Sequence, residues 1–157
     1  GHRNPQGFAY DVERNIIYSH EHGPKGGDEL NIIEPGKNYG WPEITYGIDY
    51  SGRPISAYTH KKGMEQPLYY WNPSIALSSM ILYEHDYFSS WKNCLFITGL
   101  KSRDVRRLSL KNNKVVKQER LFGKLGLRWR YITVAKTGEL YLLEDAANAT
   151  LYKVELN

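Results

Sequence analysis

The sequence predicts an all-β protein built from repeated antiparallel sheets, and three observations support this prediction. β-Branched and aromatic residues dominate the segments that alternate with polar turns, as is typical of strands. No stretch places apolar residues convincingly at i, i+3, i+4 and i+7, so helices are not expected. One arrangement of strands and turns also occurs three times along the 157 residues, which is the signature of a repeat architecture.

The repeated unit is centred on a short apolar strand that begins just after a polar turn. Its three copies are Asn15–His20, Asn93–Thr98 and Gly138–Leu143. A second strand follows each copy after a loop, at Asp28–Ile33, Asp104–Leu110 and Thr150–Leu156. A third strand precedes each copy, at Phe8–Val12, Ser74–Tyr83 and Tyr131–Ala135. Turn sequences such as Lys111–Asn113 and Lys136–Gly138 separate the strands and favour hairpins.

Three meandering units at this spacing are typical of the blades of a β-propeller. We assign the blades to residues 1–48, 66–120 and 121–157, with residues 49–65 as a polar insertion loop on one face. Propellers close with about four to eight blades, because each blade packs against two neighbours. Three blades would leave two apolar faces uncovered. We therefore expect a second copy of the chain, a missing N-terminal half or a partner chain to complete the ring.

Composition narrows the classes of function. The net charge is +4, but lysine and arginine are scattered rather than gathered in a stripe, so a nucleic-acid partner is not expected. No stretch approaches the roughly 18 apolar residues of a membrane helix, so membrane insertion is not expected either. The single cysteine, Cys94, lies in an apolar strand and is predicted to be a core residue. The chain begins within what looks like a motif, which suggests an upstream segment.

The first 41 residues contain the densest candidate site. Patches at Gly1–Gly7, Glu21–Asn31 and Asn38–Pro42 are rich in glycine, proline, amide and charge, and they flank two short apolar runs. This is typical of loops that carry a site on a scaffold of strands. Backbone carbonyls beside Asp28 and Glu29 would suit calcium, although a simple turn explains the same residues. A histidine pair, His20 and His22, could ligate zinc, but it has no evident third ligand.

Several of these patches resemble motifs of the soluble pyrroloquinoline quinone (PQQ)-dependent aldose sugar dehydrogenases, the glucose/sorbosone dehydrogenase family. The matching segments are Gly1–Gly7, Glu21–Pro24, Gly27–Asn31, Asn38–Pro42, Tyr70–Ala76, Trp91–Phe96, Gly99–Lys101 and Arg128–Arg130. They occur in order over nearly the whole chain. The resemblance covers only the C-terminal half of that family's six-bladed propeller. It implies a partial propeller of about three blades, each a four-stranded antiparallel sheet.

The resemblance also implies which residues bind the cofactor. PQQ is a planar quinone with three carboxylates, so its pocket should offer cations and amide donors. The matching positions are Arg3, Asn4, Gln6, Lys101, Arg128, Arg130 and Trp71. Arg128 and Arg130 lie two apart on a predicted strand and would share a face, although such a pair can simply face solvent. Trp71 would form an aromatic wall, or it could be a core residue.

Calcium is the second cofactor that the resemblance implies. Gly23 and Pro24 match positions whose carbonyls bind the ion that touches PQQ, and Asp28 matches a nearby carboxylate. Glu29 and Tyr39 match a second, structural calcium site, the tyrosine through its carbonyl oxygen. The family's usual aspartate after the paired arginines is replaced by Tyr131. We expect this change to remove an orienting partner from Arg130.

The function expected from the resemblance is PQQ- and calcium-dependent oxidation of aldose sugars to lactones. The family's general-base histidine belongs to the N-terminal half and has no match in this chain, so no catalytic residue is assigned. The chain would supply the cofactor-binding half, in the periplasm or outside the cell. The alternative is a non-catalytic half-propeller that self-associates, as a homodimer, and binds an anionic or sugar-like ligand.

Overall fold

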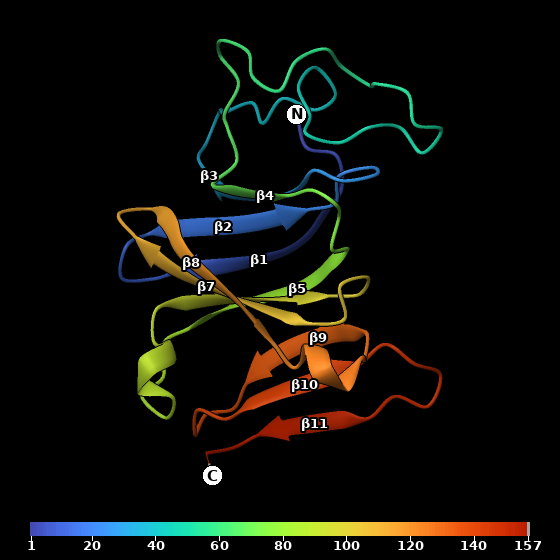
Figure 1. Cartoon of the computed structure of the whole chain (residues 1–157). Helices are drawn as coiled ribbons and strands as arrows, with labels where there is room; N and C mark the ends of the chain where they lie inside the picture. Colours follow the sequence, from blue (N-terminus) through green and yellow to red (C-terminus); the bar gives the residue numbers. More distant parts are fainter. Residues whose placement is uncertain (157) are drawn as a thin grey trace. The chain divides into compact units, whose positions relative to one another are not determined.

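The computed structural model describes residues 1–156, which form three antiparallel sheets and two short 3₁₀ helices (Figure 1). The prediction of an all-β chain is therefore confirmed. The chain divides into two units, Gly1–Leu77 and Ser78–Asn157. Within residues 1–156, no helix has the length and apolar character needed to cross a membrane.

The first unit contains one four-stranded sheet in the order β1-β2-β3-β4. Its strands are β1 (Pro5–Asp11), β2 (Ile16–Glu21), β3 (Asp28–Ile33) and β4 (Tyr69–Trp71). Strand β4 pairs with β3 through Asp28 and Trp71, so residues 34–68 leave this sheet and return to it. The first sheet therefore includes β4, which lies beyond residue 48, the end of the first blade predicted from the sequence. The short strand is difficult to predict because it follows a long loop.

Strand β1 shows the alternation that a sheet with two different faces requires. Ala9 and Asp11 are buried, whereas Phe8 and Tyr10 are exposed. Asp11 accepts hydrogen bonds from the backbone N–H and the guanidinium of Arg14, which stabilise the turn into β2. Tyr10 lies opposite Ile17 of β2, which is also exposed, so one face of this edge of the sheet is apolar.

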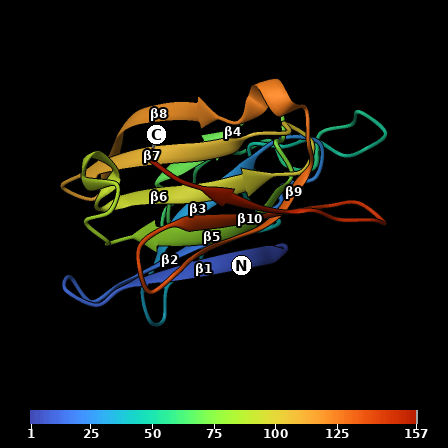
Figure 2. The same ribbon diagram turned by 90° about the horizontal axis from the view of Figure 1, so that it is seen from below.

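The second unit begins with a four-stranded sheet in the order β5-β6-β7-β8 (Figure 2). Its strands are β5 (Leu77–Tyr83), β6 (Cys94–Gly99), β7 (Val105–Lys111) and β8 (Lys114–Leu121). Every residue of β6 is buried, including Cys94, so the prediction of a core cysteine is confirmed. Asn112 and Asn113 both have positive φ, of 50° and 54°, as the tight hairpin between β7 and β8 requires.

The third sheet, in the order β11-β10-β9, belongs to the same unit and has three strands within residues 1–156, where four were expected. Its strands are β9 (Trp129–Val134), β10 (Leu140–Glu144) and β11 (Leu151–Val154). Trp129, Ile132, Leu140 and Leu142 of this sheet share a core with Phe96 of β6. The 3₁₀ helices, η1 (Ser89–Trp91) and η2 (Gly123–Leu125), lie in connections between strands.

Candidate functional site

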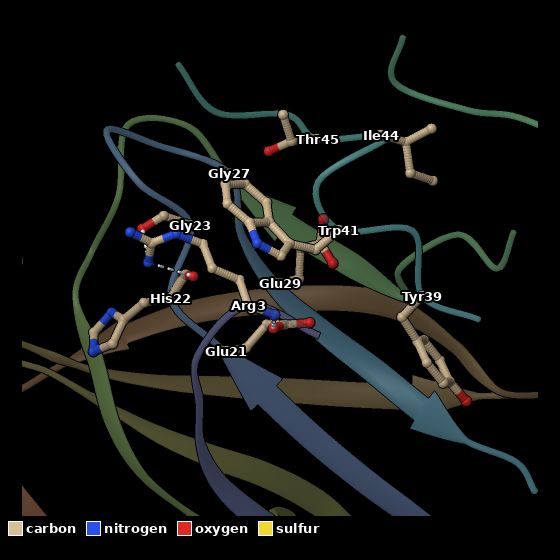
Figure 3. A pocket seen from close by; sticks show the side chains of 10 residues that line it. All are labelled: Arg3, Glu21, His22, Gly23, Gly27, Glu29, Tyr39, Trp41, Ile44 and Thr45. Atoms are coloured by element: carbon tan, nitrogen blue, oxygen red, sulfur yellow. Dashed lines mark hydrogen bonds between the residues drawn. The ribbon is translucent and has the colours of Figure 1, made fainter. Parts of the chain in front are cut away.

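A small pocket opens in the first unit where the three polar patches of the sequence meet (Figure 3). It has room for a single ion or water molecule, about 10 Å³. Its lining residues are Arg3, Glu21, His22, Gly23, Gly27, Glu29, Tyr39, Trp41, Ile44 and Thr45. The N-terminal segment, the loop between β2 and β3, and the segment after β3 therefore converge on one small volume.

The loop between β2 and β3 is shaped by close backbone contacts. A Cβ atom added to Gly23 would lie 2.0 Å from the carbonyl oxygen of Gly26, so a side chain at this position would require the loop to move. Gly27 has a φ of 68° and donates its N–H to the carbonyl oxygen of Trp71 at 2.8 Å. Glycine is needed at both positions because the chain folds back on itself there.

Glu21 orders the N-terminal segment beside the pocket. Its buried carboxylate accepts hydrogen bonds from the backbone N–H groups of Arg3, at 2.6 Å, and of Asn4, at 3.2 Å. It also contacts Nδ1 of His2 at 2.9 Å, and the His2 ring stacks on Tyr39 at 4.5 Å. This role of Glu21 is not predictable from the sequence, because the neighbouring residues do not show which donors a carboxylate will meet.

Arg3 places its guanidinium over the loop carbonyls. Its Nη1 donates to the carbonyl oxygen of His22 at 3.1 Å and to that of Gly23 at 3.3 Å, and the group lies 5.4 Å from the centroid of Trp41 (Figure 3). Trp41 is a second lining residue that the sequence analysis did not single out. Two carbonyl oxygens that accept from one cation form a locally negative surface, which is the environment that a metal cation would also need.

Glu29 gives this pocket an acidic group in unusual surroundings. Burial raises the pKa of the Glu29 carboxyl to about 7, and the hydrogen bond from Asn31 only partly offsets this rise. The negative charge of Glu21 raises the pKa further. A carboxylate that is costly to ionise without a counter-charge is suited to binding a cation.

Asp28 connects two segments of the first unit through hydrogen bonds. Its carboxylate, fully buried, accepts from the N–H of Gly23 at 3.0 Å on one oxygen. The other oxygen accepts from the hydroxyl of Ser74 at 2.8 Å and from the N–H groups of Ile75 and Ala76, both at 2.9 Å. Four donors occupy the group, so in this structure Asp28 fastens the loop and does not line the pocket.

Four of the predicted site residues of this unit line the pocket: Arg3, Gly23, Glu29 and Tyr39. The other predicted residues lie outside its lining. Gln6 donates to Oδ1 of Asn4 at 2.8 Å in an exposed pair, and Pro24 is buried. Trp71 is buried with its ring 5.0 Å from that of Tyr69 in an edge-on arrangement, which agrees with the core interpretation.

Within residues 1–156, no three His, Cys, Asp or Glu side chains are grouped closely enough to hold a metal ion by themselves. A cation in this pocket would therefore need backbone carbonyl oxygens as well as Glu29. The sequence predicts such carbonyls at Gly23 and Pro24 for one calcium site, and at Tyr39, together with Glu29, for a second. Carbonyl and carboxylate oxygens are the donors that calcium takes, so the residues present fit that ion.

In the second unit, two of the residues predicted to bind the cofactor, Arg128 and Arg130, form ion pairs with the same carboxylate. Arg128 donates from Nε and Nη2 to Oδ2 of Asp145, and Arg130 donates from the same two atoms to Oδ1. The expectation that Arg130 lacks an orienting partner is therefore wrong. Tyr131 does not carry a carboxylate, but Asp145, which follows β10, supplies one from a distant part of the sequence. Lys101 is exposed.

Three successive antiparallel sheets within residues 1–156 define the chain as part of a β-propeller. The family model described as glucose/sorbosone dehydrogenase matches residues 1–153. The chain belongs to the glucose/sorbosone dehydrogenase family. The predicted fold and family are thereby confirmed.

Individual relatives give the same result. The chain is 44% identical over 156 residues to aldose sugar dehydrogenase YliI of Escherichia coli (strain K12), covering 98% of this chain and 42% of that protein. A crystal structure of a glucose dehydrogenase matches all of this chain and 46% of its own, with 48% identity and a TM-score of 0.96. The PQQ-bound aldose sugar dehydrogenase from Streptomyces coelicolor is 26% identical, with a TM-score of 0.75, over 99% of this chain and 44% of its own. The chain thus spans less than half the length of these relatives.

Proposed function

We propose that this chain supplies the PQQ- and calcium-binding half of an enzyme that oxidises aldose sugars to lactones. The observation that carries the proposal is the pocket lined by Arg3, Gly23 and Glu29, in which Arg3 donates to the carbonyl oxygens of His22 and Gly23. Membership of the sugar dehydrogenase family and likeness to a PQQ-bound relative support it.

Calcium would be held by oxygen ligands of the first unit. Gly23 and Pro24 would supply carbonyl oxygens to the ion of the cofactor site, and the carboxylate of Glu29 and the carbonyl oxygen of Tyr39 would hold a second, structural ion. Asp28 would act indirectly, because its bond to the N–H of Gly23 fixes the loop that presents these carbonyls. The guanidinium of Arg3, which contacts the Gly23 carbonyl, would balance the acidic groups and offer donors to a nearby anionic ligand.

Each unit contains residues predicted to bind PQQ through cationic or amide side chains. Arg3, Asn4 and Gln6 would contribute from the first unit, and Lys101, Arg128 and Arg130 from the second. When bound, PQQ would accept the hydride from the sugar. The histidine base that the resemblance implies has no counterpart in this chain, so the residues here would bind and orient the cofactor and leave the proton transfer to a group outside it.

A titration with PQQ and calcium tests the proposal. We expect saturable changes in PQQ absorbance and a rise in thermal stability when both are present, because a ligand that binds only the folded state stabilises it. Calcium should tighten PQQ binding, and Glu29→Gln should weaken the response to calcium. Glu13→Gln, in the exposed turn between β1 and β2, is the matched control and should respond like the unaltered chain. No change at saturating cofactor would contradict the proposal.

The apolar face at the β1 edge suggests how the half-propeller is completed. Phe8, which is 73% exposed, Tyr10 and Ile17 lie together there, and Val12 follows at the strand's end. We propose that further blades cover this face, supplied by the rest of a longer chain or by a second copy. Exposed patches of this kind are typical of interfaces.

The oligomeric state of the isolated chain, measured by sedimentation, tests whether a second copy covers this face. We expect a two-copy species that the double substitution Phe8→Glu and Ile17→Glu converts to a folded monomer. Val116→Glu, at an exposed apolar residue of β8, is the control and should leave the species unchanged. A stable monomer for the unaltered chain at all concentrations would rule out the second copy.

We further propose that the enzyme works in the periplasm or outside the cell, where calcium is plentiful and external electron acceptors are within reach. Cell fractionation followed by detection of the protein tests this location. Recovery only from the cytoplasmic fraction would contradict it.

A further inference from the structure

Both carboxylate oxygens of Asp145 accept hydrogen bonds from the side chains of two arginines. Nε and Nη2 of Arg128 lie 2.9 and 2.6 Å from Oδ2 of Asp145, and Nε and Nη2 of Arg130 lie 2.9 and 2.8 Å from Oδ1. Each guanidinium thus uses one edge on one carboxylate oxygen. Two-pronged contacts of this kind fix the plane of the guanidinium as well as its position.

The backbone holds the three residues in this register. The N–H of Asp145 donates to the carbonyl oxygen of Arg128 at 2.7 Å. Pairing between β9 and β10 shifts next to the arginines, with Leu143 opposite Tyr131 but Glu144 opposite Trp129, so Arg130 is the extra residue of a bulge. Bulges re-aim side chains. Trp129, between the arginines, is completely buried and anchors the strand.

The junction leaves positive charge and hydrogen-bond donors unused. Two guanidinium groups meet one carboxylate, so the cluster keeps one net positive charge when all three groups are ionised. Hydrogen bonds from Arg128, and then from Arg130, lower the pKa of the Asp145 carboxyl, so it is ionised at neutral pH. Nη1 of each arginine is not used by Asp145, and the two arginine side chains are 46% and 47% exposed. These donors are available to an anion.

We propose that Asp145 is a positioning residue that locks Arg128 and Arg130 into one receptor for a carboxylate group of the cofactor. This inference rests on the proposed function and adds a residue to it. Without Asp145, two neighbouring cations would repel each other and two long side chains would regain rotamer freedom, which a ligand would then have to remove on binding.

The direction in which Asp145→Asn changes the affinity for PQQ distinguishes a positioning role of Asp145 from a purely electrostatic one. Asp145→Asn removes a negative charge next to a site for an anion, so long-range electrostatics alone would make PQQ bind more tightly. Positioning predicts the opposite. We expect Asp145→Asn to weaken PQQ binding by about 10- to 100-fold, the usual cost of losing a residue that orients a ligand-binding group. Asp145→Glu should restore part of the affinity because it keeps the carboxylate.

The experiment is a titration of the full protein with PQQ at saturating calcium, for the unaltered protein and both variants. Asp86→Asn, which alters another exposed ion pair, is the control and should bind as the unaltered protein does. NMR signals of the arginine Nε–H groups give a second readout: those of Arg128 and Arg130 should shift and broaden in Asp145→Asn. Equal or tighter binding of PQQ by Asp145→Asn would overturn the positioning role of Asp145 but not the proposed function. Failure of the unaltered protein to bind PQQ would overturn the proposed function and this inference with it.

Discussion

Replacing Asp28 by alanine is expected to lower the free energy of unfolding by about 4 kcal/mol, because it removes the carboxylate that accepts four hydrogen bonds, two of them buried. The lost bonds are those to Gly23, Ser74, Ile75 and Ala76. Three of these donors are backbone N–H groups, which cannot turn away to find water. Asp28 is fully buried, so water cannot take the place of the carboxylate without opening the unit.

Urea unfolding at neutral pH measures this effect. Asp28→Asn is a milder variant, because the amide keeps one accepting oxygen while its NH₂ group must face a donor. We expect it to lower the free energy of unfolding by a smaller amount, about 2 kcal/mol. Asp86→Ala removes an exposed carboxylate that pairs with Lys92 and should change the stability by less than about 0.5 kcal/mol. A loss for Asp28→Ala no larger than that of Asp86→Ala would show that the four hydrogen bonds do not hold the loop.

The Asp28 variants also bear on the pocket. Because Asp28 fixes the N–H of Gly23, its loss should release the loop whose carbonyls face Arg3. Calcium binding by Asp28→Asn should therefore weaken even though Asp28 does not line the pocket. An unchanged calcium affinity in a folded Asp28→Asn protein would contradict this indirect role.

The stability of the calcium-free protein is expected to fall as pH rises from about 4.5 to about 7, by up to about 3 kcal/mol through Glu29. The pKa of this carboxyl is raised to about 7 in the folded protein, chiefly by burial, from an ordinary value of 4.5. Between these values the unfolded chain releases the proton while the folded protein retains it, so ionisation favours unfolding. Well above pH 7 both states are ionised and the contribution changes no further.

Urea midpoints across this pH range, with a chelator present, test the prediction. Glu29→Gln cannot ionise, so subtracting its profile from that of the unaltered chain isolates the contribution of Glu29. Glu13→Gln serves as the exposed control and should reproduce the unaltered profile. Calcium should restore stability above pH 7, since it compensates the ionised carboxylate. Identical profiles for the unaltered chain and Glu29→Gln would contradict the prediction.

The strands were predictable because their signal is local. Alternation along Phe8–Asp11 and the apolar run of Cys94–Gly99 follow from a side-chain period of two residues. The short strand Tyr69–Trp71, which pairs with β3, is not expected from the sequence, because only three residues mark the return of the chain after a long loop. The roles of the metal and cofactor residues remain predictions, and the structure adds which of them lie together.

The sequence by itself determined the repeated all-β architecture, the family and the patches that carry the candidate site, since all of these are expressed in residue order and spacing. Only the tertiary structure decided what individual carboxylates do. Asp28 meets donors 46 to 48 residues away, and Asp145 meets Arg128 across 17 residues. Hydrogen bonds are short and directional, so the partner of a carboxylate is set by how distant segments fold together and not by the residues beside it.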